Sequence, residues 1–325
     1  MSEYFLGVDG GQSSTTAVIG DRAGRIVGWA SAGPCNHVAA AEAKAKFVRV
    51  MRECLSQAAV RAGMEAGGTH WSFKAACLGM SGGPADKNTL LHELIDSEHL
   101  IVTHDAAIAL AGALSGEPGI AVIGGTGSIA FGQNARGETV RAGGWGYVFG
   151  DEGGAFDIAR QALRAILREQ EGWGGRTALT PALLEAASAA DANELLHVFY
   201  MPEWPRHRVA GLARVVNKIA DDGDPVAVAI LQHAAQELAL LAGSVRRQLW
   251  REGEPARVAW IGGVFNSAIL LERFRALVSL EDNTTCAAPD HGPATGALLL
   301  AYRAAGSGVK LERSTAAEQH PSPDR

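Results

Sequence analysis

The sequence predicts an α/β protein made of two related halves. Three observations support this prediction. Two segments share one pattern of apolar runs and glycine turns, apolar runs of strand and helix length alternate along the chain, and 325 residues suffice for about two domains. Strands that alternate with helices are typical of mixed or parallel sheets covered by helices.

The two similar segments begin at Phe5 and at Gly119, and each is expected to form three consecutive strands. Each opens with an apolar run and turns at a Gly-Gly pair beside hydroxyl residues. Each then continues through a second apolar run and turns again at a polar sequence that contains glycine. Glycine turns between apolar runs are typical of hairpins. Two such modules in one chain favour two related domains with a cleft between them.

The other segments are expected to alternate between helix and strand. Helical spacing covers residues 40–63, 88–100, 106–114, 155–168, 181–188, 209–220, 226–251, 266–278 and 294–304. Strand-like runs cover residues 75–80, 101–103 and 258–261. The expected organisation is an N-terminal domain at 1–116, a C-terminal domain at 117–293, a helix at 294–304 that is a candidate to return to the first domain, and a flexible tail at 305–325.

The composition argues against several classes of protein. A formal net charge of −6 does not provide the broad basic surface that binds nucleic acid or anionic membranes. The N-terminal sequence is not that of a signal peptide, and the uncharged stretch at 118–135 is interrupted by glycines, so we expect a cytoplasmic protein without a membrane span. The cysteines are too scattered for a zinc or iron–sulfur site and are expected to be reduced thiols: Cys35, Cys54, Cys77 and Cys286.

The first glycine turn follows a carboxylate, Asp9, at the end of the first strand-like run. Glycines let backbone N–H groups approach a phosphate closely, and Asp9 is placed to hold Mg²⁺ directly or through water. A plain hairpin turn explains the same residues, because Asp-Gly-Gly favours turns. The candidate phosphate-contacting residues are Gly10, Gly11, Gln12, Ser13 and Ser14.

The second glycine turn, at 124–128, contains Thr126, Gly127 and Ser128. Alone it is a weak signal, but two facing hairpins of glycine and hydroxyl residues would grip a polyphosphate from both sides. No Walker-type phosphate loop occurs in the chain.

Asp105 follows a strand-like run and precedes a helix. A carboxylate at the carboxyl end of a strand points into the crevice where α/β proteins bind ligands, and it could accept the proton of an attacking hydroxyl. Asp is also a preferred N-cap residue, so a purely structural role explains the same position, and both roles can coexist.

The segment 143–154 combines glycines, aromatic residues and an acidic pair just before a helix. Aromatic faces and carboxylates are usual partners of sugar rings, and we favour a sugar-binding role. The alternative is an acidic helix start that complements the helix dipole.

Two further glycine positions are candidates for contact with a nucleotide. Gly262 and Gly263 follow a strand-like run, where missing side chains admit a base or a ribose, and Asn266 is either a ligand contact or a helix cap. Gly211 lies inside a helical pattern, where glycine costs about 1 kcal/mol relative to alanine. Close approach of a base explains this glycine, and so does tight helix packing.

From Gly7 to about Ala304 the chain resembles the N-acetylglucosamine kinase-like family, of the BadF/BadG type, within the actin-like ATPase superfamily. The segments that carry the resemblance are Gly124-Gly125-Thr126-Gly127-Ser128, Gly143-Gly144-Trp145-Gly146, Gly150-Asp151-Glu152-Gly153, Asn36-His37, Thr103-His104-Asp105-Ala106-Ala107 and Val209-Ala210-Gly211. The resemblance implies two ribonuclease-H-like domains with a nucleotide cleft between them. It also implies an ATP-dependent kinase that uses Mg²⁺, phosphorylates the 6-hydroxyl of an amino sugar and forms a homodimer.

The resemblance also implies roles for individual residues. Asp105 would be the base that takes the proton of the hydroxyl. Thr126 and Ser13 would contact phosphate, while Gly211 and the Gly262-Gly263 turn would flank the adenosine. The residues expected at the sugar are Asn36, Asp105, Gly127, Ser128, Trp145, Gly146, Tyr147 and Asp151.

Three alternatives compete with an N-acetylglucosamine kinase. Glucosamine is the nearest rival substrate. An activator-type ATPase of a partner enzyme would need interface cysteines for an iron–sulfur cluster, and the cysteines offer no such pattern. A sugar sensor that binds DNA would need a helix-turn-helix or basic extension, and none precedes Tyr4.

Overall fold

The computed structural model describes residues 4–11, 14–35, 41–65, 68–81 and 87–311. Gln12, Ser13 and Asn36, which the sequence singled out, lie outside the described residues, and so does most of the expected tail. The chain forms two compact units, which are described separately. Unit 1 consists of Met1–Glu117 and Ala288–Arg325, and unit 2 consists of Pro118–Ala287.

Unit 1 contains a five-stranded mixed sheet in the order β3-β2-β1-β4-β5. Strands β1 to β3 form antiparallel pairs, and β4 and β5 continue the sheet in parallel with β1. The strands are β1 (Phe5–Gly10), β2 (Thr15–Gly20), β3 (Ile26–Ala32), β4 (Trp71–Met80) and β5 (Ile95–His104).

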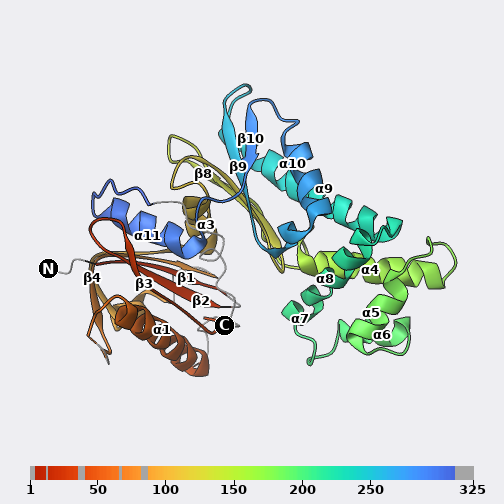
Figure 1. The fold of residues 1–325 in the computed structure, drawn as a ribbon, viewed down its shortest axis with the longest axis horizontal. Helices are drawn as coiled ribbons and strands as arrows, with labels where there is room; N and C mark the ends of the chain where they lie inside the picture. Colours follow the sequence, from red (N-terminus) through yellow and green to blue (C-terminus); the bar gives the residue numbers. More distant parts are fainter. Residues whose placement is uncertain (1–3, 12–13, 36–40, 66–67, 82–86, 312–325) are drawn as a thin grey trace. The chain divides into compact units, whose positions relative to one another are not determined.

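Helices cover both faces of this sheet (Figure 1). Helix α1 (Ala41–Arg61) packs on one face, whereas α3 (Asp105–Ala113) and α11 (Pro293–Ala304) pack together on the other. A Cβ at Gly7 would lie 2.3 Å from the backbone of Ala294, so this glycine allows α11 to approach β1 closely. The short helix α2 (Asn88–His92) precedes β5.

Unit 2 repeats the strand order of unit 1, as β8-β7-β6-β9-β10. Again three antiparallel strands are extended by two parallel ones. The strands are β6 (Gly119–Gly124), β7 (Ser128–Gln133), β8 (Thr139–Gly143), β9 (Ala256–Ile261) and β10 (Thr284–Ala287). The prediction of two three-stranded modules at these places is confirmed.

The helices of unit 2 share one hydrophobic core with its sheet, and α4 to α8 are grouped at one end of the unit (Figure 1). They are α4 (Ala155–Gln170), α5 (Leu179–Ala187), α6 (Ala192–Val198), α7 (Arg206–Gly211), α8 (Ala213–Asp221), α9 (Pro225–Leu249), the 3₁₀ helix η1 (Gly263–Asn266) and α10 (Ala268–Val278). Among the described residues, α9 alone is long and apolar enough to cross a membrane. Its buried side chains belong to the core of unit 2, which accounts for its apolar character.

The structure corrects several sequence expectations. Residues 88–100 are helical only to His92, because residues from Ile95 onward pair with β4. The helix expected at 209–220 is divided between α7 and α8, and neither α6 nor β10 was predicted. Part of the expected flexible tail is ordered, since Val309 and Leu311 pack against the core beneath α11.

Candidate functional site

Unit 1 presents two carboxylates at the carboxyl ends of its parallel strands. Asp9 is the penultimate residue of β1, and Asp105 directly follows β5 as the first residue of α3. Since β1, β4 and β5 run parallel, their carboxyl ends meet at one edge of the sheet, where α/β proteins bind ligands.

The carboxylate of Asp105 is exposed and held by two donors. Its Oδ1 accepts a hydrogen bond from the Ala106 N–H at 2.8 Å, and its Oδ2 accepts one from the Ser81 hydroxyl at 2.7 Å. The sequence offered a helix cap as an alternative role for Asp105. This expectation is wrong, because the N-cap of α3 is the preceding residue, His104. Asp105 still binds a backbone N–H of the first turn, and a lone pair on each carboxylate oxygen remains for a substrate.

Asp9 fits an oxygen ligand of Mg²⁺. Burial, and the negative charge of Asp105, raise the pKa of Asp9 to about 7. A divalent cation would offset both effects by stabilising the ionised carboxylate. Among the described residues no group of three His, Cys, Asp or Glu side chains could hold a metal by itself, so waters and phosphate oxygens would complete the coordination, as Mg²⁺ prefers.

In unit 2 the predicted glycine turns meet each other and the start of α4. The β6–β7 turn is closed by a hydrogen bond from the Gly125 N–H to the Gly127 carbonyl at 2.9 Å. The carbonyls of Gly125 and Thr126 accept hydrogen bonds from the first residues of α4. Gly262 has a φ of 105°, and a Cβ there would lie 2.4 Å from the Gly124 carbonyl oxygen, so the two turns touch only because this position is glycine.

These turns, with helices α4, α7 and α8, line a cavity of about 450 Å³. The volume lies within the range of small-molecule sites. Four predicted nucleotide or phosphate residues line it: Thr126, Gly211, Gly263 and Asn266. Three other polar residues that the sequence did not single out also line it: Arg214, Asn217 and Ser267.

The structure excludes the purely structural explanations that the sequence left open for Gly211 and Asn266. A Cβ at Gly125, Gly211 or Gly263 would meet no atom within 4 Å, so the absent side chains leave free space. Tight helix packing therefore does not explain Gly211. The N-cap of α10 is Ser267, whose hydroxyl accepts the Leu270 N–H, so Asn266 is not the cap.

A second group of predicted residues converges beside the β6–β7 turn. Asp151 is only 5% exposed, has a φ of 65° and forms an ion pair with Arg206. A Cβ at Gly127 would collide with both of these side chains. The Arg206 guanidinium lies 5.3 Å from the centre of the Tyr147 ring, and the Ser128 N–H points to Asp151 Oδ1 at 3.4 Å.

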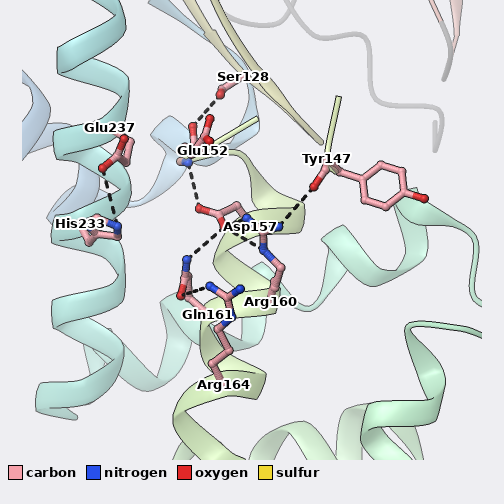
Figure 2. Close-up of polar contacts among 10 residues, drawn as sticks. Ser128, Tyr147, Glu152, Asp157, Arg160, Gln161, Arg164, His233 and Glu237 are labelled. Carbon is pink, nitrogen blue, oxygen red and sulfur yellow. Dashed lines mark hydrogen bonds and ion pairs between the residues drawn. The ribbon is translucent and has the colours of Figure 1, made fainter. Parts of the chain in front are cut away.

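The helix-dipole alternative for the acidic pair is wrong for Asp151, since α4 begins at Ala155 and the acid of its first turn is Asp157. Asp157 fixes the loop, because it accepts hydrogen bonds from the Gly153 N–H at 3.1 Å and from Arg160 at 2.7 Å. Figure 2 shows Asp157 and Arg160. Arg160 also reaches the carbonyl of Tyr147 at 3.3 Å (Figure 2).

The aromatic part of the loop is exposed. Trp145 is 67% exposed and lies under the guanidinium of Arg141, and Gly146 has a φ of 83°. Of the predicted sugar residues in unit 2, the structure therefore brings Gly127, Ser128 and Asp151 together beside Tyr147, with Trp145 and Gly146 in the same loop.

The sequence did not identify Ser81, Lys87 or Arg206. Arg206 is separated from Asp151 by 55 residues and lies in no recognisable motif, so only the folded chain reveals the pair. A hydroxyl directly after the β4 strand was the one available signal for Ser81.

The fold is that of the two-domain actin-like ATPases, which confirms the expected fold class. The chain belongs to the BadF/BadG/BcrA/BcrD ATPase family, whose model matches residues 6–301. The resemblance drawn from the sequence is therefore confirmed.

Individual relatives are similar over most of their lengths. An N-acetylmuramic acid/N-acetylglucosamine kinase of Clostridium acetobutylicum is 31% identical over 86% of this chain and 91% of its own. An N-acetyl-D-glucosamine kinase of Dictyostelium discoideum is 29% identical over 92% of this chain and 98% of its own. A Chromobacterium violaceum structure assigned as an N-acetylglucosamine kinase has 27% identity and a TM-score of 0.74, and the match covers 92% of this chain and 99% of that one.

Proposed function

We propose that this protein is an ATP-dependent kinase that transfers the γ-phosphoryl group of ATP to the 6-hydroxyl of an amino sugar, with N-acetylglucosamine as the leading substrate. The observation that carries this proposal is the similarity, along most of the chain, to two relatives whose names share N-acetylglucosamine as a substrate. The site residues described above supply chemistry that suits this reaction.

The cavity of unit 2 is the proposed nucleotide site. Gly211, the Gly262-Gly263 turn and Asn266 would flank the adenosine, in space that the missing side chains of Gly211 and Gly263 leave open. Thr126 would contact phosphate. Of the phosphate contacts predicted in unit 1, Gly10 ends β1, and Gly11 and Ser14 lie between β1 and β2. Mg²⁺, held by Asp9 with waters and phosphate oxygens, would neutralise charge on the phosphates.

Asp105 is the proposed base. As the sugar oxygen bonds to the γ-phosphorus and the bond from that phosphorus to the β–γ bridging oxygen breaks, the hydroxyl proton passes to a free lone pair of Asp105. ADP and the sugar phosphate are the products. The exposure of this carboxylate and its two fixed donors suit that role.

The loop that contains Trp145 and Asp151 is the proposed sugar-binding part of unit 2, together with Gly127 and Ser128. The buried carboxylate of Asp151 can accept hydrogen bonds from sugar hydroxyls, and the aromatic rings offer faces for the C–H side of a pyranose. Asn36, predicted at the same substrate, lies outside the described residues.

The test is a coupled assay of ADP release with ATP, Mg²⁺ and a panel of N-acetylglucosamine, glucosamine, glucose and N-acetylmuramic acid. We expect the highest kcat/KM with N-acetylglucosamine and, by ³¹P NMR, phosphate on the 6-oxygen. A preference for glucosamine would replace the proposed substrate with its nearest rival. If none of these sugars supports ADP release, the proposed sugar-kinase activity is wrong.

The homodimer, the cytoplasmic location and the lack of nucleic-acid or membrane binding remain predictions. Light scattering of the purified protein tests the homodimer: we expect a mass of about twice the 33.9 kDa of one chain.

A further inference from the structure

Lys87 is a fully buried cation in unit 1. Its side chain has 0% exposure, and lysine is almost never fully buried without partners for its ammonium group. Its ammonium donates a hydrogen bond of 2.6 Å to the carbonyl oxygen of Ser81. Burying an ammonium group costs free energy, so a role beyond packing is worth seeking.

Ser81 connects Lys87 to the carboxylate of Asp105. Its carbonyl accepts from Lys87, its N–H donates to the Gly10 carbonyl at 3.0 Å, and its hydroxyl donates to Asp105 Oδ2 at 2.7 Å. Every polar group of Ser81 is therefore occupied, and the hydroxyl is aimed at the acid.

The two donors on Asp105 fix the plane of its carboxylate. The Ala106 N–H binds Oδ1 and comes from the same helix, so it restrains the position of the side chain. The Ser81 hydroxyl binds Oδ2 and comes from the end of a different strand, β4, so it prevents rotation about the bond to the carboxylate carbon. A base works only when its lone pair is aimed at the proton that it accepts.

We propose that Ser81 and Lys87 are positioning residues for the base of the reaction: Lys87 fixes the Ser81 peptide, and the Ser81 hydroxyl orients the carboxylate of Asp105. This inference rests on the proposed function, because it assumes that Asp105 accepts the hydroxyl proton. The serine in the chain of contacts also has a chemical advantage. A hydroxyl donor orients a carboxylate while depressing its basicity less than a direct ion pair does.

The experiment measures kcat and KM for both substrates in S81A, S81T, K87M and the double variant S81A/K87M. We expect S81A and K87M each to lower kcat by roughly 10- to 100-fold while KM for sugar and ATP stays within about twofold, because the ground-state contacts of the substrates are untouched. S81T keeps the hydroxyl and should recover much of the kcat. The double variant should be no slower than S81A, because Lys87 acts through Ser81.

A matched control separates positioning from folding. Arg246 is a buried cation of unit 2, only 6% exposed, which also donates to backbone carbonyls, those of Glu254 and Asp282. R246M should leave kcat unchanged even if its melting temperature falls, whereas K87M should lower kcat while remaining folded at the assay temperature, which its melting curve checks. If K87M does not fold, the comparison of S81A with S81T and the variant K87R decide the proposal by the same readouts.

D105N makes the failure of the inference distinguishable from failure of the proposed function. If D105N keeps full sugar-dependent activity, Asp105 is not the base and the proposed mechanism is wrong. If D105N is inactive while S81A retains the wild-type kcat, Ser81 does not position it and the inference is wrong. If the loss of kcat in S81A/K87M equals the product of the losses in S81A and K87M, Lys87 does not act through Ser81.

Discussion

The two units have the same strand order but differ at two positions that carry the chemistry. Asp9 is the fifth residue of β1, and the fifth residue of the corresponding strand β6 is Ile123. Asp105 follows β5, whereas the corresponding strand β10 is followed by Ala288. A shared strand order therefore supplies the framework, and individual residues at strand ends determine which unit holds the acids.

The segment between the third and fourth strands shows the second difference. In unit 1 the described part of this segment contains one helix, α1, and in unit 2 the segment contains α4 to α9. Helices α4, α7 and α8 supply walls of the cavity, and α7 also begins with Arg206, the partner of Asp151. Unit 1 thus carries the proposed proton acceptor and metal ligand, while unit 2 carries the proposed nucleotide cavity and a sugar-binding loop.

The largest effect should come from replacing Asp105, which has no acidic counterpart in unit 2. D105N keeps the size and shape of the side chain, but an NH2 group replaces one of its two acceptor oxygens and the side chain is a much weaker base, so we expect kcat to fall by about 10²- to 10⁴-fold. Sugar affinity, measured by calorimetry, should change little. If D105N retains sugar-dependent turnover near the wild-type rate, Asp105 is not the base.

The next effect concerns the ion pair of unit 2. R206M leaves Asp151 without its cation, so the carboxylate loses its fixed orientation and we expect the sugar KM to rise roughly 10- to 100-fold with a smaller change in the KM for ATP. The control is R208M in the same helix, since Arg208 stacks on Trp204 and does not touch Asp151. Equal sugar KM values in the two variants would show that Arg206 has no part in sugar binding.

The glycine-lined cavity gives a third, smaller effect. G211A adds a methyl group in free space at the end of α7, so the helix should be no less stable, and the KM for ATP should rise by roughly tenfold because the methyl group occupies the nucleotide's space. The control is G308A, which also adds a methyl group in free space but lies in unit 1. An unchanged KM for ATP in G211A would place the nucleotide elsewhere.

Local signals predicted more of this molecule than distant contacts did. The two three-stranded modules follow from glycine turns and apolar runs that are close in sequence, and the turn residues Thr126 and Gly263 do line the cavity. Residues 95–100 were assigned to a helix because their strand character depends on pairing with β4, more than 20 residues away. Ser81 and Arg206 were missed for the same reason, since their partners Asp105 and Asp151 are 24 and 55 residues distant.

The smallest effect tests the acids of unit 1 through stability instead of turnover. Burial and the charge of Asp105 raise the pKa of Asp9 from 3.8 to about 7, so the native state binds its proton more tightly than the unfolded state does. Stability contributed by the protonated form is therefore lost as the pH rises from about 4 to about 7, and the ionised carboxylate destabilises the fold above that window. Asn cannot ionise, so in metal-free buffer D9N should melt about 2 to 6 °C above the wild type at pH 8 and near it at pH 4.

D21N should show the opposite sign at pH 8: although slight burial opposes it, hydrogen bonds from Arg25 and Ala23 lower the pKa of Asp21, and this stabilisation requires the ionised form. A D9N melting temperature that does not exceed the wild-type value at pH 8 would mean that burial and the charge of Asp105 do not raise the pKa of Asp9 in the folded protein.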